Sequence, residues 1–355
     1  MSQERTAAMS DIHIRIEGRA GRITLTREKA LNALSYDMCL AIDAALKDWA
    51  KDDAVALVVF DAAGDKAFCA GGDIAELYET GTKGDFAYGR TFWRDEYRMN
   101  ARIFEYPKPV VSFLQGFTMG GGVGIGCHGT HRVVGDSSKL SMPECGIGLV
   151  PDVGGSLLLA LAPGRLGEYL GTTGYRMDAG DAIYAGFADH YIPETTWPAL
   201  IKTLEETGDV AALEAAAQPA PESKLQAMQG DIDATFAGET AADILTVLRG
   251  RKDSFAADTL KVLERGAPLS IATTVEMIHR LRSSTATMRR ALDLEYRFTY
   301  RAMDKGDLLE GVRALIIDKD KSPKWQYADG NVPAVAVSQM LQPLGAEALS
   351  FEEES

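Results

Sequence analysis

Hydrophobic residues in the N-terminal half of the chain recur with two different periods. Residues 37–51 carry apolar side chains at helical spacing, which predicts an amphipathic helix. Elsewhere, strict alternation or a continuous apolar run predicts strands, and a continuous run is typical of a strand that is buried on both faces. The predicted strands cover residues 12–16, 22–26, 56–60, 110–114 and, more weakly, 133–134.

The order of these elements predicts the fold class and its division. Strands that alternate with helical segments are typical of an α/β fold with parallel pairing. From about residue 203 strand patterns become rare, and residues 205–246 are rich in alanine and acidic side chains. We therefore expect an α/β core over residues 1–200, a mostly helical extension over residues 201–345 and a frayed acidic tail over residues 346–355.

One uncharged segment, residues 109–130, is long enough to raise the question of a membrane span. Seven of its 22 residues are glycine, and Ser112, Gln115 and Thr118 add polar groups. Such a weakly apolar segment does not favour insertion as an independent span. A buried strand followed by a glycine-rich helix start fits the pattern better.

The composition narrows the classes of partner. The 355 residues include 37 basic and 51 acidic side chains, which gives a net charge of −14. This balance argues against general binding to nucleic acid or to anionic membranes, because both require a basic surface. An anionic small molecule would have to be held by local dipoles and a few cations.

Cysteine and histidine usage gives no sign of a disulfide framework or of a metal site. Cys39, Cys69, Cys127 and Cys145 are scattered, and the five histidines lack ligand spacing. We expect reduced, mostly buried thiols. Residues 1–11 are polar and lack the apolar core of a secretory signal, so we expect a cytoplasmic location.

Two glycine-rich segments each follow a predicted strand. Residues 67–74 have the sequence Ala-Phe-Cys-Ala-Gly-Gly-Asp-Ile, and residues 116–126 contain three successive glycines from Gly120. Glycine costs a helix about 1 kcal/mol relative to alanine, a cost tolerated where the backbone must approach a ligand or another backbone. Helices that start at these points would present free N–H groups. Close packing without a ligand is the alternative for both segments.

Residues 141–155 bring two acidic side chains into an apolar setting that is rich in glycine and proline. Glu144 and Asp152 lie eight positions apart in this segment. Burial raises the pKa of a carboxyl group, and a raised pKa suits general acid–base or nucleophilic catalysis. The alternative is structural: Glu144 would begin a helix, and Asp152 would cap a helix that starts at Val153.

Together, the three segments predict an enzyme with an oxyanion hole. Two backbone turns can supply two N–H donors to one carbonyl oxygen, while two carboxyl groups act on the carbon beside it. The chain contains no Gly-x-Ser-x-Gly sequence, which argues against an α/β-hydrolase with a serine nucleophile.

The pairing of residues 67–74 with residues 118–124 resembles the crotonase superfamily, the enoyl-CoA hydratase/isomerase family. The resemblance implies a crotonase-like spiral of ββα units in which two turns polarise the thioester of an acyl-CoA. It implies backbone N–H donors at Ala70 and Gly121. Residues 27–34 resemble the strand-to-helix turn on the CoA side. The implied substrate and CoA contacts are Lys29, Ala30, Gly71, Asp73, Ile74 and Gly120.

Within this superfamily the chain resembles the 3-hydroxyisobutyryl-CoA hydrolases. Hydratases carry a glutamate where this chain has Gly124, whereas their second glutamate matches Glu144. The Pro-Asp-Val-Gly-Gly sequence at 151–155 and the segments 310–314 and 318–325 are similar to the hydrolases. The resemblance implies hydrolysis of a short 3-hydroxyacyl-CoA, namely 3-hydroxyisobutyryl-CoA of valine catabolism. It implies no cofactor, because coenzyme A is part of the substrate.

The residues leave several alternatives open. The same two acids are compatible with an enoyl-CoA hydratase or isomerase, and the fold is compatible with a non-catalytic acyl-CoA-binding subunit. In a hydrolase, Glu144 would either attack the thioester or activate water, and Asp152 would either bind the 3-hydroxyl or act as the second acid or base. Residues 92–97 either line the acyl pocket or form a half-buried helix face, and the helix face is favoured. Beyond acyl-CoA, we expect no nucleic-acid or membrane partner, and a homo-oligomer is compatible with the sequence.

Overall fold

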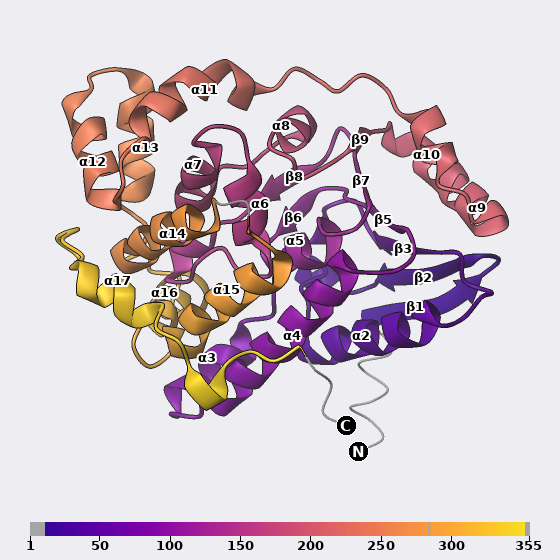
Figure 1. The fold of residues 1–355 in the computed structure, drawn as a ribbon, viewed down its shortest axis with the longest axis horizontal. Helices are drawn as coiled ribbons and strands as arrows, with labels where there is room; N and C mark the ends of the chain where they lie inside the picture. Colours follow the sequence, from indigo (N-terminus) through magenta and orange to yellow (C-terminus); the bar gives the residue numbers. More distant parts are fainter. Residues whose placement is uncertain (1–10, 283–284, 352–355) are drawn as a thin grey trace. The chain divides into compact units, whose positions relative to one another are not determined.

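The computed structural model describes residues 11–282 and 285–351 (Figure 1). Residues 1–10 of the polar N-terminus and 352–355 of the predicted acidic tail lie outside the described residues. Contacts within the chain divide it into two units, each assembled from three stretches of sequence. The first unit comprises residues 1–73, 98–141 and 176–226, and the second comprises residues 74–97, 142–175 and 227–355. A domain boundary near residue 200 stays a prediction.

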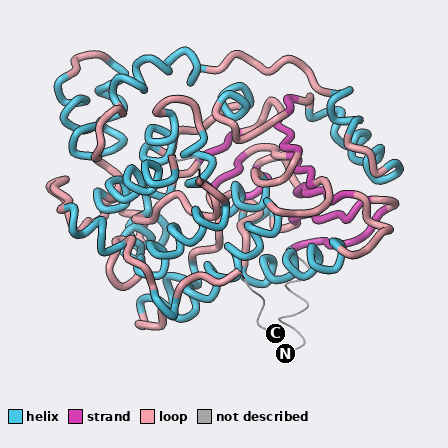
Figure 2. The backbone as a smooth tube through the Cα atoms, in the orientation of Figure 1, coloured by secondary structure: helices cyan, strands magenta, loops and turns pink. Residues whose placement is uncertain are grey.

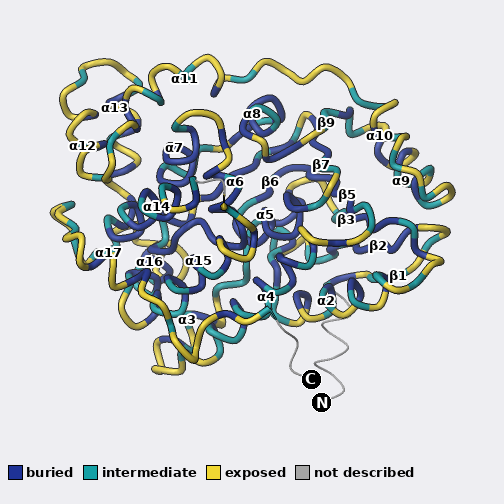
Figure 3. Tube along the Cα trace, viewed as in Figure 1, coloured by how far each residue is buried: buried dark blue, intermediate teal, exposed yellow. Residues whose placement is uncertain are grey.

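The first unit contains all the strands of the described residues (Figure 2). Its larger sheet has the order β1-β2-β3-β5-β7-β9. β1 and β2 pair antiparallel, and the other neighbours pair parallel. The predicted strands are confirmed to within two residues at their ends, and β5 is buried along its whole length (Figure 3). The bounds are β1 Ile12–Glu17, β2 Ala20–Leu25, β3 Leu57–Ala62, β5 Val110–Phe113, β7 His131–Val134 and β9 His190–Tyr191.

Two successive residues of β2 show how helices cover both faces of this sheet. Ala20 belongs to a buried hydrophobic cluster with residues of α9 (Trp197–Thr207). A Cβ at the neighbouring Gly21 would lie 2.4 Å from the ring of Trp49 in α2 (Tyr36–Ala50). Successive residues of a strand point to opposite faces, so α2 and α9 cover opposite faces of the sheet. The predicted amphipathic helix over 37–51 is thereby confirmed.

The smaller sheet has β6 between its two neighbours. It consists of β4 (Ala67–Cys69), β6 (Phe117–Met119) and β8 (Lys139–Ser141), all parallel. α5 (Gly121–Gly126) follows β6 almost directly. The uncharged segment 109–130 therefore folds into two strands and a short buried helix. Among the described residues, no helix combines the length and the apolar character that a membrane crossing requires.

The second unit is helical, as predicted for most of the C-terminal part of the chain. α14 (Pro268–Leu281) packs against α6, α7, α15 and α17. α15 (Met288–Ala302) buries the predicted apolar face. α4 (Ala87–Phe104) and α11 (Lys224–Thr235) each run from one unit into the other. The other helices are α3 Ala75–Thr82, α6 Gly155–Leu161, α7 Leu166–Thr173, α8 Ala179–Tyr184, α10 Ala211–Ala216, α12 Ala241–Gly250, α13 Ser254–Leu263, α16 Leu308–Val312 and α17 Ala334–Met340.

Candidate active site

Two glycine-rich turns of the first unit follow neighbouring parallel strands. β4 ends at Cys69 and β6 ends at Met119, and Cys69 pairs with Thr118. Parallel neighbours end at the same edge of a sheet, so the turns that follow them lie side by side. A Cβ on Gly122 would lie 2.2 Å from the Cys69 carbonyl oxygen, a distance that no larger residue tolerates without a backbone shift. The two predicted turns are therefore adjacent.

Backbone hydrogen bonds decide which N–H groups of these turns can bind a ligand. The Ala70 N–H donates to the Leu31 carbonyl at 3.0 Å. This bond occupies the amide that the family resemblance implied as an oxyanion donor. The N–H groups of Gly72 and Gly121, by contrast, have no acceptor among the described residues. In the first turn, the amides of Gly71 and Gly72 are therefore open to a ligand, whereas the amide of Ala70 is not.

The predicted CoA-side residues lie around a short 3-10 helix, η1 (Glu28–Ala30), in the first unit. Lys29 is exposed and Ala30 is half-buried. Asp73 forms an ion pair with Arg27 at 2.7 Å, which ties the first glycine turn to η1. The Asp73 carboxylate is thus already engaged within the protein.

The other predicted substrate contacts are Gly71, Gly120 and Ile74. Gly71 and Gly120 have φ angles of 123° and 48°, a backbone region that favours glycine. Ile74 is the N-cap residue of α3 in the second unit. Contacts of these residues with CoA stay predictions.

Both predicted catalytic acids lie in the second unit and are buried. Glu144 is the first residue of a 3-10 helix, η2 (Glu144–Ile147), and Asp152 lies in the turn before α6. The N-cap residue of α6 is Gly154, so the alternative that Asp152 caps this helix is wrong. Instead, the Asp152 carboxylate accepts the hydroxyl of Tyr97 at 2.7 Å.

The second unit contains two further buried carboxyl groups, those of Glu295 and Glu96. Glu295 of α15 accepts the N–H of Gly154 at 2.8 Å, the N–H of Ser156 at 3.1 Å and the Ser156 hydroxyl. Glu96 of α4 is 4% exposed and lies beside Tyr97 in sequence. Residues 92–97 thus form a helical segment whose face is more deeply buried than predicted.

The four carboxyl groups share one electrostatic environment. Within the described residues, none of them pairs with a lysine or arginine side chain. Burial raises the pKa of Asp152 to about 6, against the lowering effect of the Tyr97 hydrogen bond, and raises that of Glu295 to about 8. Burial, followed by the charge of Asp152, raises the pKa values of Glu144 and Glu96 well above the usual range of a glutamate. The cluster therefore carries less negative charge at neutral pH than its four acids would in water.

Glu295 and Glu96 escape a search for motifs. Glu295 was missed although a signal exists: it follows Leu292 by three residues and falls on the predicted apolar face of α15. A charged residue on a buried helix face needs a specific partner, and this partner lies 141 residues away in sequence at Gly154. Glu96 belongs to residues 92–97, which the sequence allows either to line the acyl pocket or to form a half-buried helix face.

The segments that resemble the hydrolases near the C-terminus form an ionic cluster around Arg313. This side chain pairs with Glu310 at 2.8 Å, with Asp318 at 2.6 Å and with Asp320 at 2.7 Å. The hydrogen bond from Arg313 lowers the pKa of Glu310. Exposed pairs of this kind order a loop and contribute little free energy of unfolding, so we assign the cluster an architectural role.

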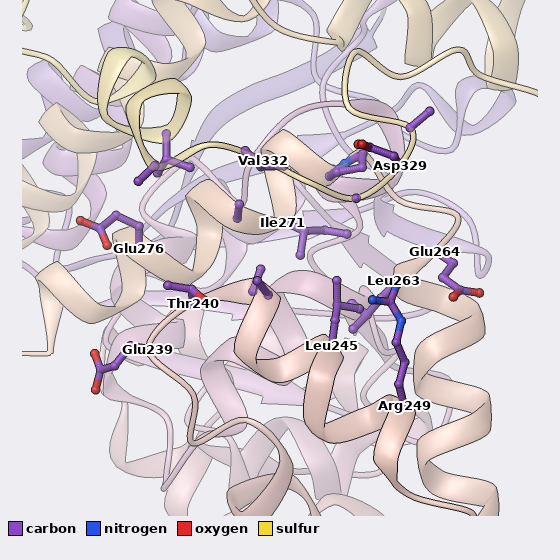
Figure 4. Close-up of a pocket in the computed structure, with 18 of the residues that line it drawn as sticks. Glu239, Thr240, Leu245, Arg249, Leu263, Glu264, Ile271, Glu276, Asp329 and Val332 are labelled. Carbon is purple, nitrogen blue, oxygen red and sulfur yellow. The ribbon is translucent and has the colours of Figure 1, made fainter.

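The second unit also contains a hollow of about 510 Å³ between α12, α13, α14 and α17 (Figure 4). Leu245, Leu263 and Ile271 line it, together with the acidic Glu264 and Asp329. The predicted site residues do not line this hollow.

The four cysteines follow the expectation from sequence. All four cysteines are free and buried. Over residues 11–282 and 285–351, no group of three or more His, Cys, Asp and Glu side chains is arranged to hold a metal ion.

With this fold and these sites, the chain belongs to the enoyl-CoA hydratase/isomerase family, whose model matches residues 20–341. It is similar to the mitochondrial 3-hydroxyisobutyryl-CoA hydrolases of Rattus norvegicus and Homo sapiens. The rat protein is 36% identical over 354 residues, which cover 96% of this chain and 91% of the relative. The human protein is 35% identical over 364 residues, which cover 98% and 92%. Since these relatives are named as mitochondrial, a cytoplasmic location stays a prediction.

Two solved structures match almost the whole chain. An enoyl-CoA hydratase from Rhodobacter sphaeroides is 56% identical with a TM-score of 0.93, and the match covers 96% of this chain and all 100% of that one. A carnitinyl-CoA dehydratase from Mycobacterium thermoresistibile is 39% identical with a TM-score of 0.91, and covers 97% and 99%. The predicted crotonase-like α/β fold with a helical C-terminal part is confirmed.

Proposed function

We propose that this chain is an acyl-CoA thioester hydrolase that releases 3-hydroxyisobutyrate and free coenzyme A from 3-hydroxyisobutyryl-CoA. The observation that carries the proposal is the buried Glu144 and Asp152 pair, combined with Gly124 at the position where hydratases have an acid. Relatives with this hydrolase name, 34% to 38% identical, support the substrate. Such a reaction belongs to valine degradation.

The amides of Gly72 and Gly121 are the proposed oxyanion donors. Attack on a thioester carbonyl places negative charge on its oxygen, and two N–H groups that lack another acceptor stabilise that charge. One such donor typically contributes about 3–4 kcal/mol to transition-state stability. The adjacency of the two turns, fixed by Gly122 against Cys69, supports their action on a single oxygen.

The carboxyl pair is proposed to supply the nucleophile and the proton. Asp152, with a pKa of about 6, is the acid that ionises first, and burial, followed by the charge of Asp152, raises the pKa of Glu144. Hydrolysis requires that one carboxylate attack the carbonyl carbon or activate water, and that a carboxylic acid protonate the departing thiolate. A pair that shares one proton can do both, in the manner of coupled acids.

Direct attack by a carboxylate and activation of water by a carboxylate can be distinguished by oxygen-18 labelling. Direct attack forms an anhydride between the acyl group and the enzyme, and its hydrolysis can return a water oxygen to the side chain. Turnover in oxygen-18-labelled water, followed by mass spectrometry of the peptide that contains Glu144 and Asp152, would detect this exchange. Incorporation of the label supports a covalent anhydride, and an unlabelled peptide excludes an anhydride that water opens at the carbonyl carbon of the side chain.

Hydration of an enoyl-CoA is the second candidate, because a solved relative that is 56% identical is named as a hydratase. Hydration needs one group to activate water and another to deliver a proton to the α-carbon. With glycine at position 124, the second acid would have to be Asp152. A role in binding acyl-CoA without catalysis is disfavoured by the two intact acids.

Incubation with 3-hydroxyisobutyryl-CoA and, separately, with crotonyl-CoA distinguishes the three functions. A hydrolase releases free thiol from the first ester, and a hydratase removes the enone absorbance of the second. Tight binding without turnover of either ester would indicate a binding subunit. The Glu144→Gln variant should lose about 100- to 10,000-fold in turnover while it still binds acyl-CoA. Near-normal thiol release by this variant would overturn the assignment of Glu144.

A further inference from the structure

The hollow of about 510 Å³ lies within the second unit, between α12, α13, α14 and α17 (Figure 4). Leu245, Leu263 and Ile271 give it apolar walls. Cavities that bind small organic molecules measure roughly 300–1,000 Å³ and combine apolar walls with a few polar groups. Neither Glu144 nor Asp152 lines this hollow, so a molecule bound here would be distinct from the acyl-CoA of the candidate active site.

The hollow is lined by charged side chains of both signs. Arg249 is the one basic residue among the described residues that line it, and Figure 4 shows its side chain extending from α12 into the hollow. The side chains of Arg249 and Glu264 form no hydrogen bond or ion pair with the described residues. Glu276, by contrast, pairs with Arg280 at 2.7 Å, and Figure 4 shows its carboxylate pointing away from Ile271. Arg249 and Glu264 thus offer a ligand one positive and one negative group that lack a counter-charge.

The charges and the walls together define the class of ligand. A carboxylate suits Arg249, because the guanidinium presents a fork of N–H donors that matches two oxygens. An ammonium group suits Glu264. Glu239 and Asp329 also line the hollow, and their negative charge disfavours an anion that carries no positive group. The α-amino acids with apolar side chains combine a carboxylate, an ammonium group and an apolar body in one small molecule.

Helix α14 connects the hollow to the segment that carries Glu144. Pro268, the first residue of α14, lines the hollow. The neighbouring Ala267 N–H donates to the carbonyl of Cys145 at 2.8 Å, and the Cys145 sulfur lies 3.3 Å from the Thr274 hydroxyl of α14. Cys145 follows Glu144 in η2. A ligand that moves the start of α14 therefore also moves the backbone next to Glu144.

We propose that this hollow is an effector site that binds an apolar α-amino acid and changes turnover at Glu144 through α14. The effect on turnover rests on the proposed thioester hydrolase function, whereas the binding itself does not. A ligand shifts the equilibrium between two arrangements of a helix only as far as it binds them unequally. An amino acid that contacts Arg249 of α12, Glu264 at the end of α13 and Ile271 of α14 supplies that difference, because it fixes these helices relative to one another.

Titration calorimetry with L-leucine and three analogues tests the class of ligand. 4-Methylpentanoate lacks the amino group, 3-methylbutylamine lacks the carboxylate, and glycine lacks the apolar side chain. We expect L-leucine to bind at least about tenfold more tightly than each analogue, because each analogue loses a charged hydrogen bond or the apolar contacts. No binding of L-leucine, or equal binding of either singly charged analogue, would overturn the proposal.

Variants test whether L-leucine binds in the hollow. Arg249→Gln and Glu264→Gln each remove one charge, and Ala272→Leu fills part of the hollow with a larger side chain. Each should weaken L-leucine binding at least about tenfold and keep the melting temperature of the wild type. Lys261→Gln removes an exposed cation of α13 that does not line the hollow, and this matched control should bind L-leucine like the wild type. Unchanged binding in any of the three hollow variants would overturn the assignment of the site.

Turnover tests the effector role. The kcat value is measured by thiol release at saturating 3-hydroxyisobutyryl-CoA, with and without L-leucine. We expect L-leucine to change kcat of the wild type by about fivefold or more and to leave kcat of Arg249→Gln unchanged. Binding of L-leucine without a change in kcat would overturn the effector role. A wild type that releases no thiol would instead overturn the proposed hydrolase function, and calorimetry would still decide whether the hollow binds an amino acid.

Discussion

Glu295 accepts the backbone N–H of Gly154 at 2.8 Å across 141 residues of sequence. The turn it holds includes Val153 and Gly154, with φ angles of 54° and 82°. Positive φ is costly for a β-branched residue such as Val153 and persists only where the surroundings impose it. The three hydrogen bonds to Glu295 impose it, and they thereby set the backbone from which Asp152 projects.

Replacement of Glu295 by glutamine should impair catalysis more than binding. The amide would direct N–H donors at groups that are themselves donors, so the 152–156 turn would shift. We expect kcat to fall about 10- to 100-fold with KM within about threefold, measured by thiol release on 3-hydroxyisobutyryl-CoA. Asp293→Asn on the same helix, where Asp293 pairs with Arg297 at 2.6 Å, should leave both constants unchanged.

A second readout distinguishes positioning from simple loss of stability. If Glu295 acts through Asp152, its replacement should also move the acidic limb of the pH profile, because the Asp152 charge and Glu295 interact. A lower melting temperature with an unchanged kcat and an unchanged pH profile would contradict the positioning role.

The pH dependence of kcat/KM should follow the ionisation of Asp152. Burial raises its pKa to about 6, so the carboxylate is present above that pH and is lost as the pH falls through it. If the carboxylate is required, kcat/KM should be about tenfold lower at about pH 5 than at about pH 7.5. In Tyr97→Phe, which loses the hydrogen bond that lowers this pKa, the limb should move to higher pH. A flat profile from about pH 5 to 8 would contradict the role of Asp152.

Local sequence patterns were sufficient to predict secondary-structure elements and the two candidate catalytic acids. Alternation, apolar runs and helical spacing depend on neighbouring residues, so they predict α2 and the strands of the larger sheet other than β9. Glu144 and Asp152 are conspicuous because acids in an apolar loop are costly to bury. These predictions need no knowledge of distant contacts.

Tertiary contacts explain what spacing could not show. Glu295 gains its role from a partner 141 residues away, and Glu96 from burial that its own segment does not determine. The Ala70 N–H is held by the carbonyl of Leu31, which comes from another turn of the chain. A motif places residues in order along the chain but does not orient their amides.

Gly122 should not tolerate replacement even by alanine, which adds a single carbon atom. In Gly122→Ala the new Cβ would lie 2.2 Å from the Cys69 carbonyl oxygen, so the two glycine turns must separate. Displacing one oxyanion donor typically costs about 100- to 1,000-fold in kcat, and we expect a loss of this size. Gly230→Ala in α11 is the control, because a Cβ there has no neighbour within 4 Å. Wild-type turnover by Gly122→Ala would argue against the paired turns as the oxyanion hole.

Glu168 should contribute to stability without contributing to chemistry. Its side chain is completely buried in α7 and pairs with Arg165 and His279, each at 3.0 Å, and with Arg282. Although burial alone would raise its pKa, the hydrogen bond from His279 and the charge of Arg282 lower it, so the ionised form stabilises the fold above the unfolded pKa and this contribution is lost as the pH falls. Glu168→Gln should therefore lower the free energy of unfolding by about 3 kcal/mol. This value is at the lower end of what breaking a buried ion pair costs, because the two arginines are partly exposed.

Urea unfolding near neutral pH measures this change, and thiol release by the folded protein measures its effect on catalysis. Glu276→Gln, which removes the half-exposed pair with Arg280, is the matched control and should change the free energy of unfolding by less than about 1 kcal/mol. The difference between the variants should shrink towards acidic pH, where Glu168 is protonated in both folded and unfolded chains. A constant difference from neutral to acidic pH would instead assign the effect of Glu168 to packing.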